Sequence, residues 1–423
     1  MINKCNMEQV KNIWFYLEPY VFISEDRDRY LFYNTWMKKG MDFYRNHAID
    51  RIVNHLQQTD NMYSVLIHAD ELDDSRLYEF VQSMQAEGYG DLLEGDLPKP
   101  VIMPPLLNLQ KSVERMKKNE LPIGENILSN LQDVTIYLNG SCRHDCRDCA
   151  LMFTQWSCCT KTGNSLDFHL LKDFLQSIVY TRASINLTGG NPFEYPELYE
   201  LLEILGRNAS MQTFIVNYRN IPDNLDALYV FTNDSFQLKI LVCDSYQAES
   251  LVAMAVKLKQ GNIRQLWEIG ITSVAEYESA EQLSEQLAEH DIRVVIKPYF
   301  NGKNLAFFEE YIFVRQEDLL AVELDRQDVF ALQELNTHDF GKITVLSDGQ
   351  IYANVNREPI GNIREPVADM LCRELESGTS WRCTRYGVEL CNQCRFRLIC
   401  PSPSNYEFAL GRPNLCHVET DKN

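Results

Sequence analysis

The sequence predicts an α/β protein: a partial barrel of six βα units, with a small α+β region before it and a cysteine-rich region after it. Two observations predict the barrel. Six strand-like runs alternate with helix-like runs between residues 131 and 318, which is typical of parallel βα units. Six units are too few for a complete eight-stranded barrel. A third observation, eleven cysteines in two groups at 142–159 and 372–416, indicates chemistry at one strand end and in the tail.

Composition and charge limit the class of protein. A chain of 423 residues fits two or three domains. The formal net charge of -20 disfavours nucleic acid as a partner, because an acidic surface repels phosphates. No apolar run reaches the eighteen residues or so of a membrane span, and the start lacks a secretory signal. We therefore expect a cytoplasmic protein with no membrane partner. In a reducing compartment, clustered cysteines suggest metal before disulfide.

The first region, residues 1–97, shows short strands and helices. WFYLEPYVFIS and YLFYNT predict two strands around the charged turn EDRDR, within 14–34, and GMDFYRN predicts a short third one. Apolar residues at helical spacing predict helices over 47–57 and 74–88, the second with an Asp–Ser cap. The segment LPKPVIMPP holds four prolines and predicts a linker, taken as 98–130, across which we expect few contacts.

The middle region, residues 131–318, contains the expected barrel. Strands are predicted at 133–139, 184–190, 212–218, 236–243, 266–273 and 292–300. Helices are predicted between most of them, at 166–180, 196–207, 246–259 and 276–290. Residues 319–423 have few periodic runs, and their end is rich in cysteine.

The strongest motif is NGSCRHDCRDCALM, directly after the first barrel strand. Its thiolates at Cys142, Cys146 and Cys149 are soft ligands that suit an iron–sulfur cluster or zinc. Three ligands leave a fourth iron of a cubane free to bind a substrate or cofactor. A zinc knuckle, or scattered buried cysteines, is the alternative interpretation. The nearby Cys158 and Cys159 suit buried small side chains as well as a function.

This motif at this place resembles the radical S-adenosylmethionine (SAM) superfamily. The resemblance implies a radical SAM barrel with one SAM-binding 4Fe–4S cluster on the three cysteines. It also implies that Gly189, Gly190, Asn191 and Pro192 hold the amino group of the methionine part, where the family has Gly-Gly-Glu-Pro. An ordinary strand-to-helix turn is the alternative for this segment. Because Asn191 replaces an acid, we expect backbone carbonyls to carry more of the binding. Asp148 stands where the family has an aromatic residue.

The second cysteine group, at the end of the chain, contains Cys391, Cys394, Cys400 and Cys416. Four thiolates can close a cluster or hold a tetrahedral zinc ion. The spacing resembles the SPASM or twitch-like domain of radical peptide maturases, which implies auxiliary 4Fe–4S clusters in residues 319–423. Two ligand positions of one such cluster are here Asn354, after the hairpin LSDGQIYAN, and Ser404. We therefore expect a single auxiliary cluster. Roles for Cys372 and Cys383 stay open.

The first region is similar in pattern to the winged-helix domain by which peptide-modifying enzymes recognise leader peptides. The resemblance implies a precursor peptide with a leader as the partner, and a flavodoxin- or ferredoxin-type electron donor. It also implies reductive cleavage of SAM to a 5′-deoxyadenosyl radical, which would install a thioether, C–C or C–O link. No catalytic side chain is assigned. Two alternatives stay open: a catalytically degenerate relative that only binds a peptide, and a zinc-dependent binding module.

Overall fold

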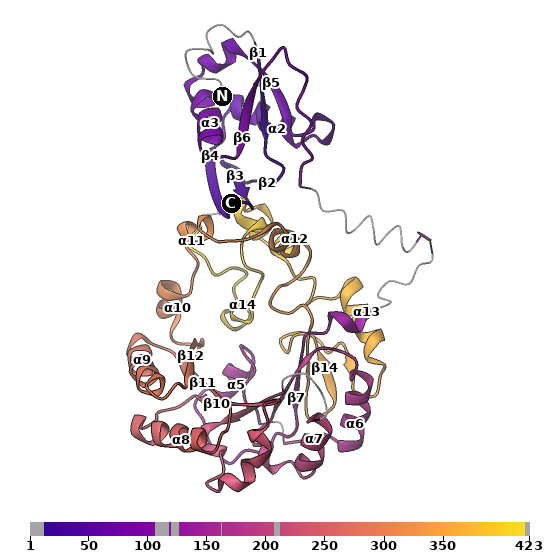
Figure 1. The fold of residues 1–423 in the computed structure, drawn as a ribbon, viewed down its shortest axis with the longest axis vertical. Coiled ribbons are helices and arrows are strands. Elements are labelled where there is room, and N and C mark those ends of the chain that lie inside the picture. Colours follow the sequence, from indigo (N-terminus) through magenta and orange to yellow (C-terminus); the bar gives the residue numbers. More distant parts are fainter. Residues whose placement is uncertain (1–11, 106–117, 120–126, 162, 207–211, 419–423) are drawn as a thin grey trace.

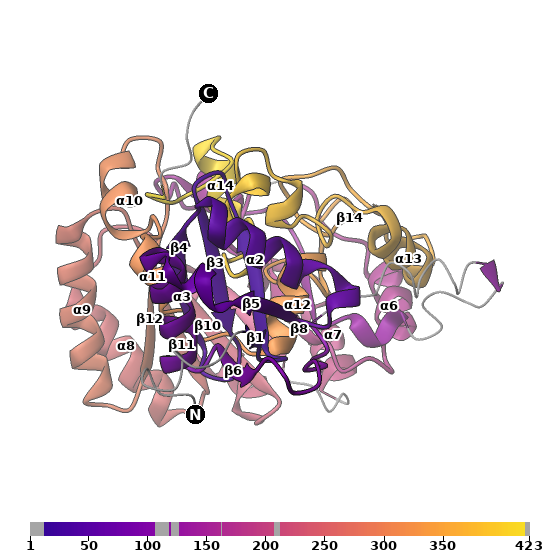
Figure 2. The same cartoon turned by 90° about the horizontal axis from the view of Figure 1, so that it is seen from above.

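The computed structural model describes residues 12–105, 118–119, 127–161, 163–206 and 212–418. Figure 1 shows the N-terminal domain at one end of the long axis, the barrel at the other, and segments of the tail between them. Seen from above, the N-terminal domain lies over the centre of the remaining chain, with α9 and α13 towards opposite ends (Figure 2). Among the helices of these residues, none has the length and apolar content needed to cross a membrane.

Within residues 12–97, the N-terminal domain contains two antiparallel three-stranded sheets and two α-helices. One sheet has the order β5-β1-β6 and the other β2-β3-β4. The elements are β1 (Asn12–Leu17), β2 (Val21–Glu25), β3 (Arg29–Asn34), β4 (Lys39–Tyr44), α2 (His47–Gln57), β5 (Ser64–His68), α3 (Ser75–Ala86) and β6 (Gly90–Glu94). Both helices were expected, and Asp74 caps α3 by accepting from Arg76 N. The core between sheets and helices is built on Phe15, Phe32 and Phe80.

The strand prediction for this domain was partly wrong. The expected single strand at 14–24 is two strands that belong to different sheets, because the chain turns at Glu18, whose carbonyl accepts from Val21 N. Strands β5 and β6 were not predicted. Each has five residues, too few for a clear alternating pattern, and each is recruited by pairing with β1.

All six predicted barrel strands are present and parallel. They follow the order β12-β11-β10-β9-β8-β7. The strands are β7 (Asp133–Tyr137), β8 (Ser184–Thr188), β9 (Gln212–Asn217), β10 (Phe236–Val242), β11 (Gln265–Ile271) and β12 (Arg293–Pro298). The helices that pack on their outer face are α6 (Phe168–Ser177), α7 (Leu198–Leu205), α8 (Ala248–Gln260) and α9 (Val274–Ala288). The predicted partial (β/α)6 barrel is therefore confirmed.

The tail continues the barrel sheet and then folds back over it. Strand β13 (Lys342–Val345) pairs in parallel with β7 and forms the expected hairpin with β14 (Gln350–Tyr352), followed by β15 (Gly361–Asn362). The segments before and after the hairpin contain short helices: α10 (Leu305–Tyr311), α11 (Gln316–Leu320), α12 (Arg326–Glu334), α13 (Val367–Ser377) and α14 (Asn405–Leu410). The first three connect the barrel to the hairpin.

The N-terminal domain is docked on the tail, so the expectation of few contacts was wrong for this pair. One apolar cluster contains Phe22, Leu31 and Tyr33 from the outer face of β2 and β3 together with tail residues. The tail members are Leu319, Val329, Phe396, Leu398, Ile399 and Val418. Sheet β2-β3-β4 is therefore covered on both faces, which explains why strand β3 is buried along almost its whole length.

Candidate functional site

The first cysteine group lies at the carboxyl end of the barrel strands. The chain leaves β7 at Tyr137, passes Cys142 and Cys146 in a loop, and enters α5 (Cys149–Phe153). All three thiols are partly exposed. Active sites of parallel α/β barrels collect at this edge, because loops from several strands meet there. Cys146 and Cys149 are close enough to interact electrostatically.

The Gly189–Gly190 pair packs directly against the backbone that leads to Cys142. A Cβ atom on Gly190 would lie 2.1 Å from the Ser141 carbonyl oxygen, and one on Gly189 would lie 2.6 Å from the Asn139 oxygen. Gly190 N also donates to the Asn139 carbonyl at 2.8 Å. The two glycines therefore allow the ends of β7 and β8 to approach more closely than any side chain would permit.

The carbonyls after the glycine pair are already held by asparagines. Asn220 Nδ2 donates to the Gly190 carbonyl at 3.1 Å, and Asn139 Nδ2 donates to the Asn191 carbonyl at 2.9 Å. The Asn191 side chain accepts from Phe193 N and caps the short turn that begins at Pro192. Each carbonyl keeps a second lone pair for a ligand. The asparagines thus orient the acceptors that the sequence predicts for the cofactor.

Polar residues from the next two strand ends surround Cys146. Asn217, which ends β9, donates to the Cys146 sulfur at 3.7 Å. Asp244, just after β10, accepts from Arg147 N at 2.9 Å and pairs with Arg219 at 3.2 Å. Burial and the Asp244 carboxylate raise the pKa of the Cys146 thiol to about 12. Asn217 and Asp244 were not predicted from the sequence, although polar residues directly after buried parallel strands were a usable signal.

Cys149 is linked to the neighbouring Cys158–Cys159 pair. Its sulfur donates to the Cys159 carbonyl at 3.4 Å. A separate hydrogen bond with the Cys159 side chain lowers the pKa of Cys149. Cys158 and Cys159 are themselves buried, at 1% and 5% exposure. Cys158 packs among Met152, Trp156 and Tyr299 in the barrel interior. These two cysteines therefore line and support the third thiol.

Asp148, the departure from the family pattern, adopts a left-handed conformation with φ 59° at the start of α5. Its carboxylate accepts from the Tyr299 hydroxyl at 3.3 Å and pairs with Arg147 at 3.5 Å. Arg147 in turn pairs with Glu276 at 2.9 Å. Asp148 thus ties the cysteine loop to the end of β12, on the far side of the barrel opening.

The four tail cysteines lie together. The thiol of Cys400 interacts electrostatically with those of Cys391, Cys394 and Cys416. A cavity of about 110 Å³ is lined by three of the four, Cys391, Cys400 and Cys416. Cys416 is brought to the group because the adjacent backbone pairs with Val314, far away in sequence. Burial raises the pKa of Cys394 to about 11 and of Cys400 to about 12.

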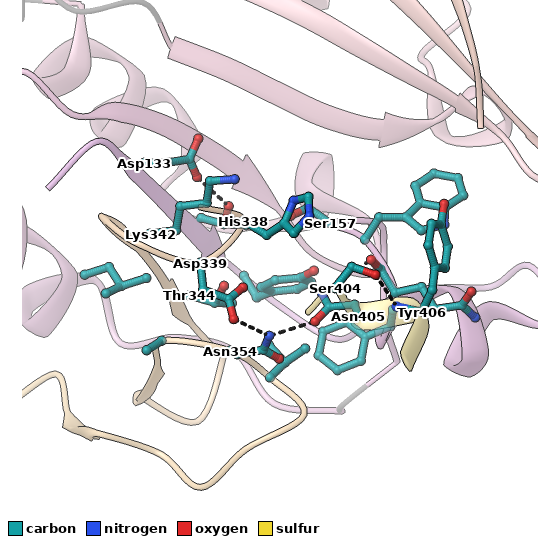
Figure 3. Close-up of a pocket in the computed structure, with 18 of the residues that line it drawn as sticks. Asp133, Ser157, His338, Asp339, Lys342, Thr344, Asn354, Ser404, Asn405 and Tyr406 are labelled. Atoms are coloured by element: carbon teal, nitrogen blue, oxygen red, sulfur yellow. Dashed lines mark hydrogen bonds between the residues drawn. The ribbon is translucent and has the colours of Figure 1, made fainter. Parts of the chain in front are cut away.

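The two positions that lack family ligands, Asn354 and Ser404, line one cavity of about 330 Å³ between barrel and tail. Figure 3 shows Asn354 between Asp339 and Asn405, to which its Nδ2 donates at 2.9 and 2.7 Å. Ser404 caps α14. Hydrogen bonds thus engage the side chains at both positions where the resemblance would put cluster ligands. Burial raises the pKa of Asp339 to about 6.

Charged side chains also fill the barrel interior beside this cavity. Glu268 on β11, with a side chain only 4% exposed, pairs with Lys239 at 2.8 Å and lies 3.6 Å from Lys297. Lys297 lies over the ring of Trp156 at 4.8 Å, and both residues line the cavity. The interior wall therefore combines aromatic surface with a buried ion pair, which the sequence analysis did not predict.

The two remaining tail cysteines, Cys372 and Cys383, are placed by other contacts. Cys383 accepts from Arg357 Nη2 at 3.6 Å, and Cys372 lies on α13 against the barrel core. Over the described ranges, no three His, Cys, Asp or Glu side chains already have the arrangement of a metal site. By donor chemistry, however, three partly exposed thiols on one loop and four gathered thiols in the tail fit iron–sulfur clusters, because thiolates are their usual ligands.

The chain thus has three parts: a small N-terminal domain, a six-stranded parallel barrel with a cysteine loop after its first strand, and a cysteine-rich tail. No protein-family model matches the chain, and no curated protein sequence matches it. Solved structures do. Streptococcus suis SuiB bound to precursor peptide SuiA is 13% identical, with a TM-score of 0.51, 96% of this chain and 99% of that one covered.

SuiB bound to S-adenosylmethionine gives 12% identity, a TM-score of 0.49 and coverage of 95% and 98%. A third structure, anSMEcpe with bound S-adenosylmethionine and a Cp18Cys peptide, gives 12% identity and a TM-score of 0.44, covering 66% of this chain and 94% of that one. The match to SuiB extends over the N-terminal domain, barrel and tail. The fold class predicted from the sequence is therefore confirmed, and SuiB shares this fold along almost its whole length.

Proposed function

We propose that this chain is a radical SAM enzyme that modifies a ribosomally made precursor peptide. The observation that carries the proposal is the packing of Gly189 and Gly190 against the backbone that leads into the Cys142 loop. This packing joins the expected cluster ligands and the expected cofactor-binding turn into one site at the barrel opening. When bound, the 4Fe–4S cluster and SAM together supply a 5′-deoxyadenosyl radical.

The chain's own residues would bind and orient the cofactor. Cys142, Cys146 and Cys149 would hold the cluster and leave one iron open to the methionine part of SAM. The carbonyls of Gly190 and Asn191, each oriented by an asparagine donor, would accept from the cofactor's amino group. This arrangement compensates for the acid that Asn191 replaces, because a carbonyl with a free lone pair accepts from an ammonium group without needing a charge of its own.

The peptide partner is supported by the N-terminal domain and the cavity. Strand β4 lies at an edge of its sheet, and an extended leader peptide can add to such an edge through backbone hydrogen bonds. The 330 Å³ cavity beside the barrel interior is large enough for a residue of the peptide. SuiB, which shares this fold, was solved with a precursor peptide. The bond formed would be a thioether, C–C or C–O link.

The tail cysteines would hold one auxiliary 4Fe–4S cluster, which would supply a second electron-transfer centre, and the electron donor would be a flavodoxin- or ferredoxin-type protein. Asn354 and Ser404 support a count of one, because their side chains are engaged in a polar network and a helix cap. Two cubanes per chain correspond to about eight irons.

The test is anaerobic reconstitution with iron and sulfide, followed by incubation with SAM and dithionite. We expect about eight irons per chain and formation of 5′-deoxyadenosine. The triple variant with Cys142, Cys146 and Cys149 changed to Ala should keep the tail iron and form no 5′-deoxyadenosine. Cys372→Ser, at a cysteine outside both groups, is the matched control and should behave as the unmodified protein. Cofactor cleavage by the triple variant, or zinc as the sole bound metal, would refute the proposal.

A further inference from the structure

The segment between Cys394 and Cys400 also forms part of the surface against which the N-terminal domain packs. The turn Arg395–Leu398 begins directly after Cys394, and Ile399 directly precedes Cys400. Its Phe396, Leu398 and Ile399 are buried in the apolar cluster shared with β2 and β3, and the cysteines themselves pack against that cluster. One short piece of chain thus serves the cysteine centre on one side and the domain interface on the other.

Arg395 joins the two parts by charge. Its guanidinium, on a side chain 7% exposed, pairs with Asp26 at 2.6 Å and with Asp42 at 3.2 Å, both in the N-terminal domain. The same group donates to Gln316 on α11 at 2.9 Å. Asp42 also pairs with Arg29, so two arginines and two carboxylates form one network across the interface.

A buried network of this kind is sensitive to position. Charges removed from water are tolerated only while partners and geometry are good, and separation of one partner leaves the others desolvated and unpaired. Arg395 directly follows Cys394 in the chain, so a shift of the backbone at Cys394 also shifts Arg395. Only five residues separate Cys394 from Cys400, which leaves little slack to absorb such a movement.

We propose that Arg395 is a positioning residue that couples the tail cysteine centre to the N-terminal domain. With metal on Cys391, Cys394, Cys400 and Cys416, the 395–399 segment is held in the shape that docks the domain. Without metal, the segment relaxes and the domain detaches more readily. This inference rests on the metal centre of the proposed function and adds a mechanical role to it: placing the domain that would receive the peptide over the barrel.

Thermodynamic linkage makes the coupling reciprocal. If metal binding favours docking, docking must favour metal retention by the same factor. Hydrogen bonds to charged groups contribute enough to change an equilibrium by roughly tenfold to a hundredfold each. Loss of Arg395 should therefore uncouple the two sides without removing a single metal ligand.

The experiment compares hydrogen–deuterium exchange of residues 21–44, which cover β2 to β4, in the full chain with and without metal. Iron with sulfide is the first probe, and Zn²⁺ alone is the second, because four thiolates also bind zinc. In the unmodified protein we expect metal to slow exchange in this segment by roughly tenfold or more. In Arg395→Met the tail should bind metal, while exchange of 21–44 is fast with or without it.

Controls separate positioning from a general loss of structure. Arg412→Met is matched in chemistry but pairs with Glu309 on α10, so its response to metal should equal that of the unmodified protein. Asp26→Asn is a second test variant, used if Arg395→Met folds poorly. It removes the charge that pairs with Arg395, so exchange of 21–44 should again be fast with or without metal. Exchange of 21–44 that is independent of metal in the unmodified protein, or an Arg395→Met chain that responds normally, would overturn the proposal. A tail that binds neither iron with sulfide nor Zn²⁺ would overturn it too. Cofactor cleavage at the first cluster is measured separately, so a failure of this inference can be told apart from a failure of the proposed function.

Discussion

Gly190→Ala tests whether the contact between the ends of β7 and β8 builds the site. The added methyl group would lie 2.1 Å from the Ser141 carbonyl oxygen and 2.5 Å from its carbon. Ordinary contacts begin at 3.4 Å, so the two backbones would have to separate by about 1 Å or more. Both partners are backbone atoms, so no flexible side chain can move aside to relieve the overlap.

The cost has two parts. Overpacking of a buried position costs about 1–3 kcal/mol. Separation also breaks or weakens the 2.8 Å hydrogen bond from Gly190 N to the Asn139 carbonyl, which adds about 1 kcal/mol. We therefore expect the free energy of unfolding to fall by about 2–4 kcal/mol. A misplacement of about 1 Å at a reacting site lowers rates by about a hundredfold, which is the loss expected in 5′-deoxyadenosine formation.

Stability is measured by urea unfolding, with tryptophan fluorescence as the signal. The rate of 5′-deoxyadenosine formation and the iron content are measured on the same variants. Gly387→Ala is the matched control, because a Cβ atom there meets no atom within 4 Å. The control should change stability by less than about 0.5 kcal/mol and leave the rate unchanged. A Gly190→Ala chain as stable and active as Gly387→Ala would show that the close approach of the two strand ends does not build the site.

Two further predictions follow from buried charge and buried apolar surface. Asp339→Asn should stabilise the protein by about 1–2 kcal/mol at pH 8, less than the full value of its shift because the carboxylate is only partly buried. Because the pKa of Asp339 is raised to about 6, the unmodified protein loses stability as pH rises from about 4 through 6. The stability gained by Asp339→Asn, measured by urea unfolding, should therefore shrink to about half at pH 5. An equal gain at both pH values would contradict this. Deletion of residues 1–97 should expose the apolar segment around Phe396, and size-exclusion chromatography should then show aggregates. A truncated chain that is monomeric and binds the full amount of metal in its tail would show that this segment is not a buried domain interface.

The barrel and the two cysteine groups could be predicted from the sequence because their signals are local. Most barrel strands are runs rich in apolar residues followed by a helix with its own periodicity, as in FQLKILVC and the helix after it. The spacing of Cys142, Cys146 and Cys149 lies within eight residues, and its position after a strand needs no knowledge of distant contacts. The N-terminal cap of α3 at Asp74 could be predicted for the same reason.

Tertiary structure decided what depends on partners far apart in sequence. Strands β5 and β6 are stable only because β1 pairs with both. Asn217 and Asp244 meet Cys146 because three parallel strands end at one edge. Arg395 meets Asp26 across 369 residues of chain. The sequence by itself determined the barrel elements and the two cysteine groups, whose patterns lie within short stretches of chain. The contacts that place one domain against another come from surface complementarity, which no local period records.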